Sequence, residues 1–192
     1  MQRDRIRGDF ILLAVAIVWG SGFVAQRVAA AYLSPWMYNG TRFLLGALVV
    51  LPLVAKRLRD LSRIEWRGGI LAGLLLFGAA LFQQVGMRFT TAGKAGFITG
   101  LYVVIVPLLL ALVWREWPRW SAWLASLMAT VGLFLLSGLG RLALAPGDGW
   151  VVACAVMWAL HVILIGRLAP RTDALRLALV QYVVCGVLSI GI

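Results

Sequence analysis

Apolar residues in this chain are gathered into runs of about twenty, and this feature most constrains the fold. The seven runs cover residues 10–31, 36–55, 68–87, 95–114, 120–138, 150–169 and 174–192. With 62% hydrophobic residues the chain is too apolar for a water-soluble globule. A helix of about twenty residues crosses roughly 30 Å of hydrocarbon. Because the apolar residues are continuous and do not alternate with polar ones, the sequence predicts an all-α fold, a polytopic transmembrane helical bundle of seven spans.

Positive charge is concentrated in alternate connections between the runs. The net charge of +11 would suggest a nucleic-acid partner in a soluble protein, but here the basic residues flank apolar spans. One side carries Arg3, Arg5, Arg7, Lys56, Arg57, Arg59, Arg63, Arg67, Arg115, Arg119, Arg167, Arg171 and Arg176, and the other carries Arg88, Lys94 and Arg141. Since basic connections stay in the cytoplasm, we expect a multi-pass inner-membrane protein with a cytoplasmic N-terminus and no nucleic-acid partner.

Part of the sequence pattern recurs at an offset of 139 residues. Equivalent residues are Gly8 and Gly147, Asp9 and Asp148, Trp19 and Trp158, Arg42 and Gln181, and Phe43 and Tyr182. The copy begins five spans after the first helix, and because five is odd the two copies insert in opposite directions. We assign the first repeat to residues 8–138 and the first two helices of a second, incomplete repeat to residues 147–192. Inverted repeats are typical of secondary transporters, whose substrate site lies near the midplane between the repeats.

Several short motifs occur in a characteristic order along the first repeat. They are Trp-Gly-Ser-Gly-Phe at 19–23, Pro35, Arg42-Phe43, Gly-Met-Arg-Phe-Thr-Thr-Ala at 86–92, Ala-Gly-Phe-Ile at 95–98, Pro107-Leu108, Glu116 and Gly132. Through them the chain resembles the EamA-domain branch of the drug/metabolite transporter superfamily. The resemblance implies a ten-helix carrier that exports amino-acid-like or other small organic solutes by alternating access. Helices eight to ten of that pattern are missing, so we expect a fragment or a truncated form.

Polar and aromatic side chains inside the spans are the candidates for a substrate path, because such groups are costly in hydrocarbon unless they find partners. The candidates are Trp19, Gln26, Arg42, Gln83, Thr99, Tyr102, Trp158, His161 and Gln181. His161 is the only histidine and lies near the midplane, where it could bind substrate or couple transport to protons. The alternative for each candidate is a purely structural role in helix packing.

Four basic residues, Arg27, Arg42, Arg88 and Lys94, fall in the outer half of the predicted bundle, where only Asp148 opposes them. A vestibule lined by these side chains would favour a carboxylate or another anion and would disfavour lipophilic cations. For Arg27 and Arg42 the first interpretation is that they snorkel to the membrane surface, and the vestibule is the alternative.

Small residues and a proline predict details of helix packing. Glycine strips that let helix backbones approach closely are Gly69 with Gly73 in the third span, and Gly93 with Gly96 and Gly100 in the fourth. Pro107 interrupts the hydrogen-bond ladder of the fourth span and predicts a kink there.

No motif in the sequence indicates catalysis. There is no His, Cys and acid cluster with metal spacing, no phosphate-binding loop and no nucleophile elbow. We therefore expect a transporter and not an enzyme, with no cofactor and no metal site. Its partners would be a small-molecule substrate and the lipid bilayer, with proton or ion coupling and the oligomeric state left open. The alternative function is a non-transporting membrane scaffold subunit or an inactive truncated remnant.

Overall fold

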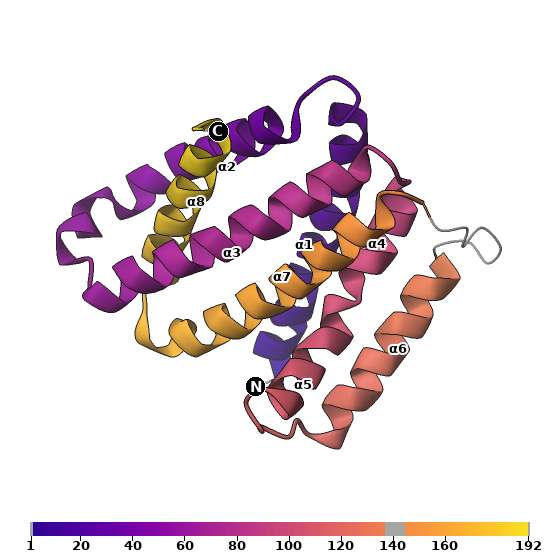
Figure 1. The fold of residues 1–192 in the computed structure, drawn as a ribbon. Helices are drawn as coiled ribbons and strands as arrows, with labels where there is room; N and C mark the ends of the chain where they lie inside the picture. Colours follow the sequence, from indigo (N-terminus) through magenta and orange to yellow (C-terminus); the bar gives the residue numbers. More distant parts are fainter. Residues whose placement is uncertain (1, 137–144, 192) are drawn as a thin grey trace.

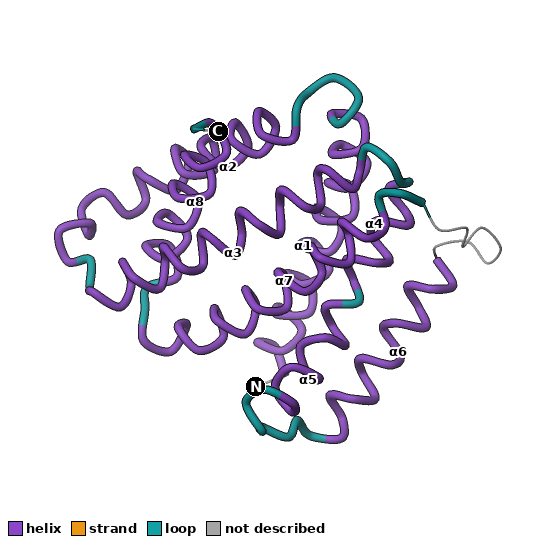
Figure 2. Tube along the Cα trace, in the orientation of Figure 1, coloured by secondary structure: helices purple, strands orange, loops and turns teal. Residues whose placement is uncertain are grey.

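The computed structural model describes residues 2–136 and 145–191, and within them only helices and connecting turns occur (Figure 1). The α-helices are α1 (Gln2–Ala29), α2 (Pro35–Val54), α3 (Arg63–Met87), α4 (Ala92–Gly100), α5 (Tyr102–Leu112), α6 (Trp120–Leu136), α7 (Asp148–Leu168) and α8 (Ala174–Ile190). Two short 3-10 helices, η1 (Ala55–Asp60) and η2 (Ala169–Arg171), follow α2 and α7. The tube in Figure 2 shows how short the remaining turns are. The expected all-α bundle is confirmed for the described residues.

The helices follow the seven predicted apolar runs, with α4 and α5 together forming the fourth. Four helical stretches are long and apolar enough to cross a membrane, namely Ile6–Ala29, Arg63–Met87, Ala92–Leu112 and Asp148–Arg171. Trp120–Leu135 and Ala174–Ile190 are apolar but shorter, and α2 has 20 residues. The predicted end of the fifth span at 137–138, Arg141 and the last residue of the seventh span lie outside the described residues.

Four of the eight α-helices, α2, α3, α4 and α8, begin at a side chain that caps the free backbone N–H groups of the first turn. Ser34 accepts from the N–H of Met37 at the start of α2, where Pro35 occupies the first helical position. Thr91 caps α4 in the same way by accepting from the N–H of Lys94. Polar residues in the turns therefore set the starts of these helices.

Helix α3 runs through the middle of the bundle, packing against α7 and α8, while α2 lies along α8 (Figure 1). Gly69 and Gly73 make the α3–α8 contact close. A Cβ atom on Gly69 would lie 2.6 Å from Cβ of Val180, and one on Gly73 would lie 2.7 Å from Cβ of Val184. The predicted glycine strip of the third span is therefore confirmed as a packing surface.

The glycine strip predicted for the fourth span is wrong in part. No atom lies within 4 Å of a Cβ placed on Gly93, and Gly96 meets only the ring of Phe23 at 4.0 Å. Only Gly100 is tightly packed, against Leu133 of α6. Gly93 lies in the exposed first turn of α4, where no neighbouring helix approaches.

The fourth span is interrupted at Leu101, between α4 and α5, and not at Pro107, which lies inside α5. A proline cannot donate to the carbonyl four residues earlier, so the carbonyl of Val103 loses its helical partner. The hydroxyl of Ser126 on α6 donates to this carbonyl at 3.0 Å. The neighbouring helix thus compensates for Pro107, as hydrocarbon surroundings require.

Helices α1 and α7 run in opposite directions, and so do α2 and α8. Gln84 near the end of α3 donates to the backbone carbonyl of Gln26 near the end of α1. Thr90, just after α3, donates to Asp148, the first residue of α7. The end of α1 and the start of α7 therefore share one end of the bundle, so α1 and α7 are antiparallel. An ion pair between Arg57, just after α2, and Asp173, just before α8, shows the same for α2 and α8.

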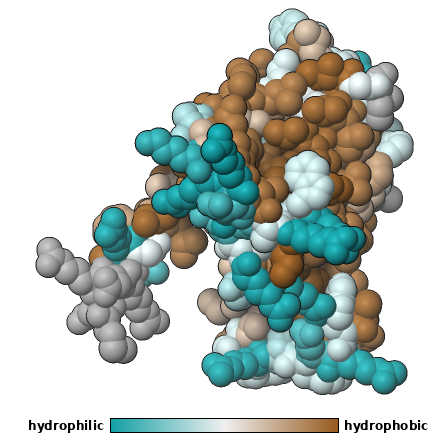
Figure 3. Space-filling model, turned by 90° about the vertical axis from the view of Figure 1, so that its left-hand side faces the viewer, coloured by the Kyte–Doolittle hydropathy of each residue, from teal (hydrophilic) through white to brown (hydrophobic). Residues whose placement is uncertain are grey.

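The outer surface is strongly apolar, as expected of a protein whose solvent is lipid. Large side chains of the first half of α1 are exposed, including Phe10 at 69% and Leu12 at 67%. Figure 3 shows wide apolar areas, with the hydrophilic side chains gathered together instead of being scattered.

Candidate functional site

Aromatic and polar side chains meet at the middle of α7. The ring of Trp158 lies 5.5 Å from that of His161 in an edge-to-face arrangement, and 5.6 Å from the ring of Trp19 on α1. His161 Nε2 and Gln181 Oε1 of α8 are 2.8 Å apart, and both side chains are buried. Because the amide oxygen can only accept, the proton of this hydrogen bond belongs to Nε2 of the imidazole. Three helices thus contribute to one central group.

A second contact joins α3 and α4. Gln83 Nε2 donates to Thr99 Oγ1 at 3.2 Å, and both residues are buried. The buried indole Nε1 of Trp158 has no hydrogen-bond partner among the described residues. Six of the nine predicted site residues therefore form two sets of contacts in the bundle interior, four residues in the first set and two in the second. We call these six residues, Trp19, Gln83, Thr99, Trp158, His161 and Gln181, the central group.

Two aromatic pairs join residues that lie 139 positions apart in the sequence. The tilted rings of Trp19 and Trp158 are 5.6 Å apart, and those of Phe43 and Tyr182 are 5.8 Å apart. The first pair joins α1 to α7 and the second joins α2 to α8.

Arg42 on α2 lies beside the second ring pair. Its guanidinium carbon is 4.6 Å from the centre of the Phe43 ring and 5.3 Å from that of Tyr38. The side chain is partly exposed, and no carboxylate of the described residues lies within ion-pair distance of it. Its charge is therefore balanced only by the faces of two aromatic rings.

The other predicted site residues do not join the central group. Gln26 is buried and accepts from Gln84 through its backbone carbonyl, while its own side-chain oxygen has no partner among the described residues. Tyr102 is half-buried at the start of α5, with no hydrogen bond or ring contact in the described part of the chain.

Asn39 on α2 is a buried polar residue that the sequence reading missed. Its side chain is 1% exposed, and neither amide atom has a hydrogen-bond partner among the described residues. Leaving a buried amide unpaired costs about 1–3 kcal/mol, so such a group is expected to meet water or a ligand. Asn39 could have been identified from the sequence, because it is an asparagine inside an otherwise apolar run, one helical turn before Phe43.

At the end of the bundle where α7 begins, an ion pair joins the two repeats. Lys94 of α4 pairs with Asp148, and Asp148 also accepts from Thr90 at 3.0 Å and from the N–H of Ala145 at 2.8 Å. Arg27 and Arg88 are exposed. Lys94 is thus neutralised by the only acidic residue of that side, so the expected vestibule of four free cations is not formed.

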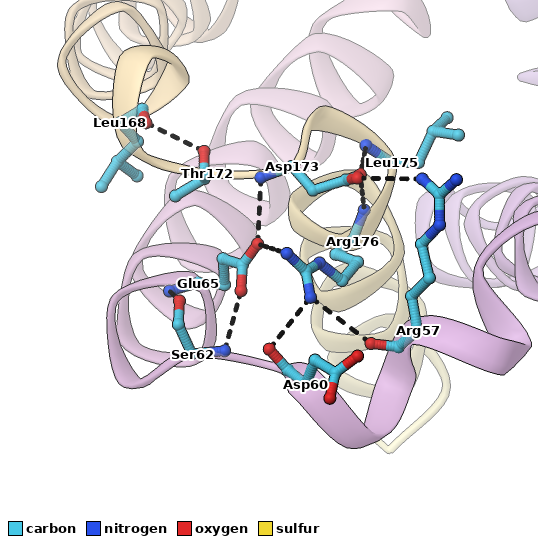
Figure 4. Close-up of polar contacts among 9 residues, drawn as sticks. All are labelled: Arg57, Asp60, Ser62, Glu65, Leu168, Thr172, Asp173, Leu175 and Arg176. Atoms are coloured by element: carbon cyan, nitrogen blue, oxygen red, sulfur yellow. Dashed lines mark hydrogen bonds and ion pairs between the residues drawn. The ribbon is translucent and has the colours of Figure 1, made fainter.

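At the opposite end, a polar network ties the turn after α2 to the turn before α8 (Figure 4). Glu65 is 1% exposed and accepts from the N–H of Ser62 at 2.8 Å, the N–H of Asp173 at 2.9 Å and the guanidinium of Arg176 at 2.9 Å. The same guanidinium donates to the carbonyl of Asp60 at 2.9 Å. We call these five residues the Glu65 junction.

Asp173 of the Glu65 junction also caps α8. Its carboxylate accepts from the N–H groups of Leu175 and Arg176 and pairs with Arg57 at 3.5 Å. These contacts, the Arg176 N–H first among them, hold the pKa of Asp173 below its usual value. These contacts thus hold the start of α8 against the turn after α2 and the start of α3.

Comparison with known proteins identifies the family. Residues 6–138 match the EamA-like transporter family. The chain belongs to this family. It is therefore a multi-pass membrane protein of a transporter family, which confirms the resemblance seen in the sequence. No solved structure matches the chain significantly.

Two curated relatives cover nearly all of the chain. The protein named "Uncharacterized transporter" from Archaeoglobus fulgidus is 31% identical over 185 residues, 96% of this chain and 57% of the relative. The protein named "Uncharacterized transporter YvbV" from Bacillus subtilis is 26% identical over 187 residues, 94% of this chain and 60% of the relative. The chain thus spans less than two thirds of the length of either relative.

Within the described residues, no group of three or more His, Cys, Asp and Glu side chains could hold a metal ion.

Proposed function

We propose that the chain is a secondary carrier that moves a small organic solute by alternating access between two inverted repeats. The observation that carries this proposal is the contact between equivalent residues, Trp19 with Trp158 and Phe43 with Tyr182. Such contacts are expected where two repeats, here residues 8–138 and 147–192, meet at a two-fold axis in the membrane plane. The antiparallel course of α1 and α7, and of α2 and α8, supports the same relation. Carriers built this way bind substrate at the repeat interface.

The central group supplies the chemistry for binding a small amino-acid-like solute. Trp19 and Trp158 offer aromatic walls, while His161 and Gln181 exchange one hydrogen bond that a solute could replace. Replacing a hydrogen bond inside the bundle avoids leaving a buried polar group unpaired. His161 is the titratable group of this set, so coupling to a proton would act through its imidazole.

Ion pairs close both ends of the bundle around the central group. Lys94 and Asp148 join the repeats at one end, and Glu65 and Arg176 join them at the other. We propose that transport opens these two connections in turn, with export as the direction. The basic end, which carries the Glu65 junction, would face the cytoplasm together with the N-terminus, and the membrane would be the inner membrane.

The proposal is tested by comparing the solutes that cells release. Cells producing the 192-residue chain, its His161→Ala variant or its Val162→Ala variant are compared with vector controls by mass spectrometry of the medium. His161 is buried against Gln181, whereas Val162 is 39% exposed on another face of α7. We expect the chain and Val162→Ala to raise the release of at least one small organic solute, and His161→Ala to abolish the increase at equal membrane abundance. An unchanged solute profile for the chain would contradict the carrier role and favour a non-transporting scaffold subunit.

A further inference from the structure

Arg42 carries a positive charge inside a helix whose surroundings hold no matching negative charge. It lies about 10 Å along α2 from Pro35, at 1.5 Å per residue. The carboxylates of residues 30–136 and 145–191 all lie at helix ends or in turns, at Asp60, Glu65, Glu116, Asp148 and Asp173. Four of these five are already ion-paired, with Arg176, Arg167, Lys94 and Arg57. An unpaired cation in a membrane span costs a few kcal/mol and is typically retained because it binds something.

Two rings hold the guanidinium of Arg42 in place. Phe43 and Tyr38 lie 4.6 Å and 5.3 Å from its carbon, so the cation lies over aromatic faces. A cation–π contact does not use the guanidinium N–H groups as conventional hydrogen-bond donors to oxygen, so they can still donate to an anion. A pair of parallel N–H groups matches the two oxygens of a carboxylate. The partly exposed side chain is thus ordered for an anion that has access to it.

The position of Arg42 relative to the central group indicates the shape of that anion. Phe43 stacks on Tyr182, the residue next to Gln181, and Gln181 is bonded to His161. A solute whose anionic group lies at Arg42 would have the rings of Phe43 and Tyr38 beside it, with Tyr182 on the far side of Phe43. These groups suit an aromatic body.

We infer that Arg42 is the receptor for the carboxylate of a small, singly charged organic acid that binds at the exposed side of this guanidinium on α2. This inference rests on the proposed carrier function and names its substrate class. A monoanion and Arg42 form a pair with no net charge, which lowers the cost of holding both inside hydrocarbon. A phosphate monoester carries nearly two negative charges at neutral pH and would leave one of them unbalanced.

Binding to the isolated protein tests the inference without relying on transport. The 192-residue chain is placed in nanodiscs of zwitterionic phosphatidylcholine, and displacement of tritiated phenylacetate is measured with unlabelled phenylacetate and with phenylacetamide. The two probes differ only in the charged group. We expect phenylacetate to compete about tenfold better, the factor that corresponds to loss of one charge-assisted hydrogen bond.

Variants of Arg42 and one control decide the result. Arg42→Gln should remove the preference for phenylacetate, whereas Arg42→Lys should retain part of it because the charge remains. Arg27→Gln changes an exposed arginine on α1 and should leave the preference unchanged. Equal loss in Arg27→Gln, or a preference that survives Arg42→Gln, would overturn the inference. Arg42→Lys also controls for misfolding. A partial preference for phenylacetate in this variant would show that the protein is folded and that the charge at position 42 sets the preference.

A lipid headgroup is the other source of an anion for Arg42. Adding phosphatidylglycerol to the nanodiscs should leave phenylacetate binding unchanged, and competition by this lipid that disappears in Arg42→Gln would assign Arg42 to lipid instead. The binding and solute-release experiments distinguish failure of the carrier role from failure of the carboxylate site. Binding that depends on Arg42 without solute release would refute only the carrier role. Solute release without a preference set by Arg42 would refute only the carboxylate site.

Discussion

Replacing Glu65 with glutamine should destabilise the bundle far more than the same change at an exposed carboxylate. Glu65 accepts three hydrogen bonds, from the N–H groups of Ser62 and Asp173 and from the guanidinium of Arg176, at 2.8 to 2.9 Å. Glutamine keeps the shape but has one acceptor oxygen, and its amide group faces a donor. The ion pair with Arg176 is lost as well.

The expected magnitude follows from burial. The side chain of Glu65 is 1% exposed and that of Arg176 is 18% exposed. Losing a hydrogen bond to a charged group costs about 1.5–3 kcal/mol, and breaking a buried pair costs about 3–5 kcal/mol. We expect about 3 kcal/mol for Glu65→Gln, which for a protein of this size corresponds to a melting temperature lower by about 6–12 °C.

Two buried cysteines provide the assay. Cys154 and Cys185 are free thiols with 0% exposure, so a thiol-reactive fluorogenic dye reports their exposure as the detergent-solubilised protein unfolds on heating. The matched control is Glu116→Gln. Glu116 pairs with Arg167 at 2.8 Å, but these side chains are 61% and 42% exposed.

An exposed pair contributes at most about 1 kcal/mol, so Glu116→Gln should lower the melting temperature by no more than about 4 °C. Equal shifts for Glu65→Gln and Glu116→Gln would refute the reasoning from burial. A double-mutant cycle with Arg176→Gln should show that the effects of Glu65 and Arg176 are not additive.

Two further outcomes are expected in the same thermal assay. Gly73→Ala should lower the melting temperature, because the new Cβ would lie 2.7 Å from Cβ of Val184 and 3.1 Å from the carbonyl oxygen of Gln181. Gly93→Ala should leave the melting temperature unchanged, because there is open space around Gly93. A shift as large for Gly93→Ala would contradict the close α3–α8 contact. The second outcome concerns Asp173, whose contacts lower its pKa in the folded protein. The stabilisation that these contacts provide is complete above the ordinary aspartate pKa of about 4. It is lost as the pH falls through the lower pKa of the folded protein. The loss of melting temperature between neutral and acidic pH should therefore be smaller in Asp173→Asn, which can still cap α8, and an unchanged pH profile would show that this carboxylate contributes nothing.

Helix positions could be predicted because the signals for them are local. Runs of apolar residues give the spans, and Ser34 and Thr91 act as caps within the turns where the sequence places punctuation. The interruption of the fourth span was predicted less well. Pro107 is visible in the sequence, but the hydroxyl of Ser126 that accommodates it comes from another helix.

Contacts that depend on three-dimensional arrangement could not be read from the chain. Glu65 and Arg176 are each part of a basic connection in the sequence, and nothing local shows that they pair. Lys94 appeared free for the same reason, although it pairs with Asp148. One long-range contact could be predicted from the sequence, through the pattern that recurs at an offset of 139 residues. Trp19 and Trp158, which the offset of 139 residues relates, do touch in the structure.

The packing of α2 against α8 has a consequence for biosynthesis. About 120 residues separate the end of α2 at Val54 from the start of α8 at Ala174. At about 5–20 residues per second, α8 follows α2 out of the ribosome only after about 6–24 s. During that interval the α2 face that carries Gly40, which finally packs on Ile190, has no α8 partner. The α2 face that carries Gly40 therefore stays uncovered in the newly made chain until α8 arrives.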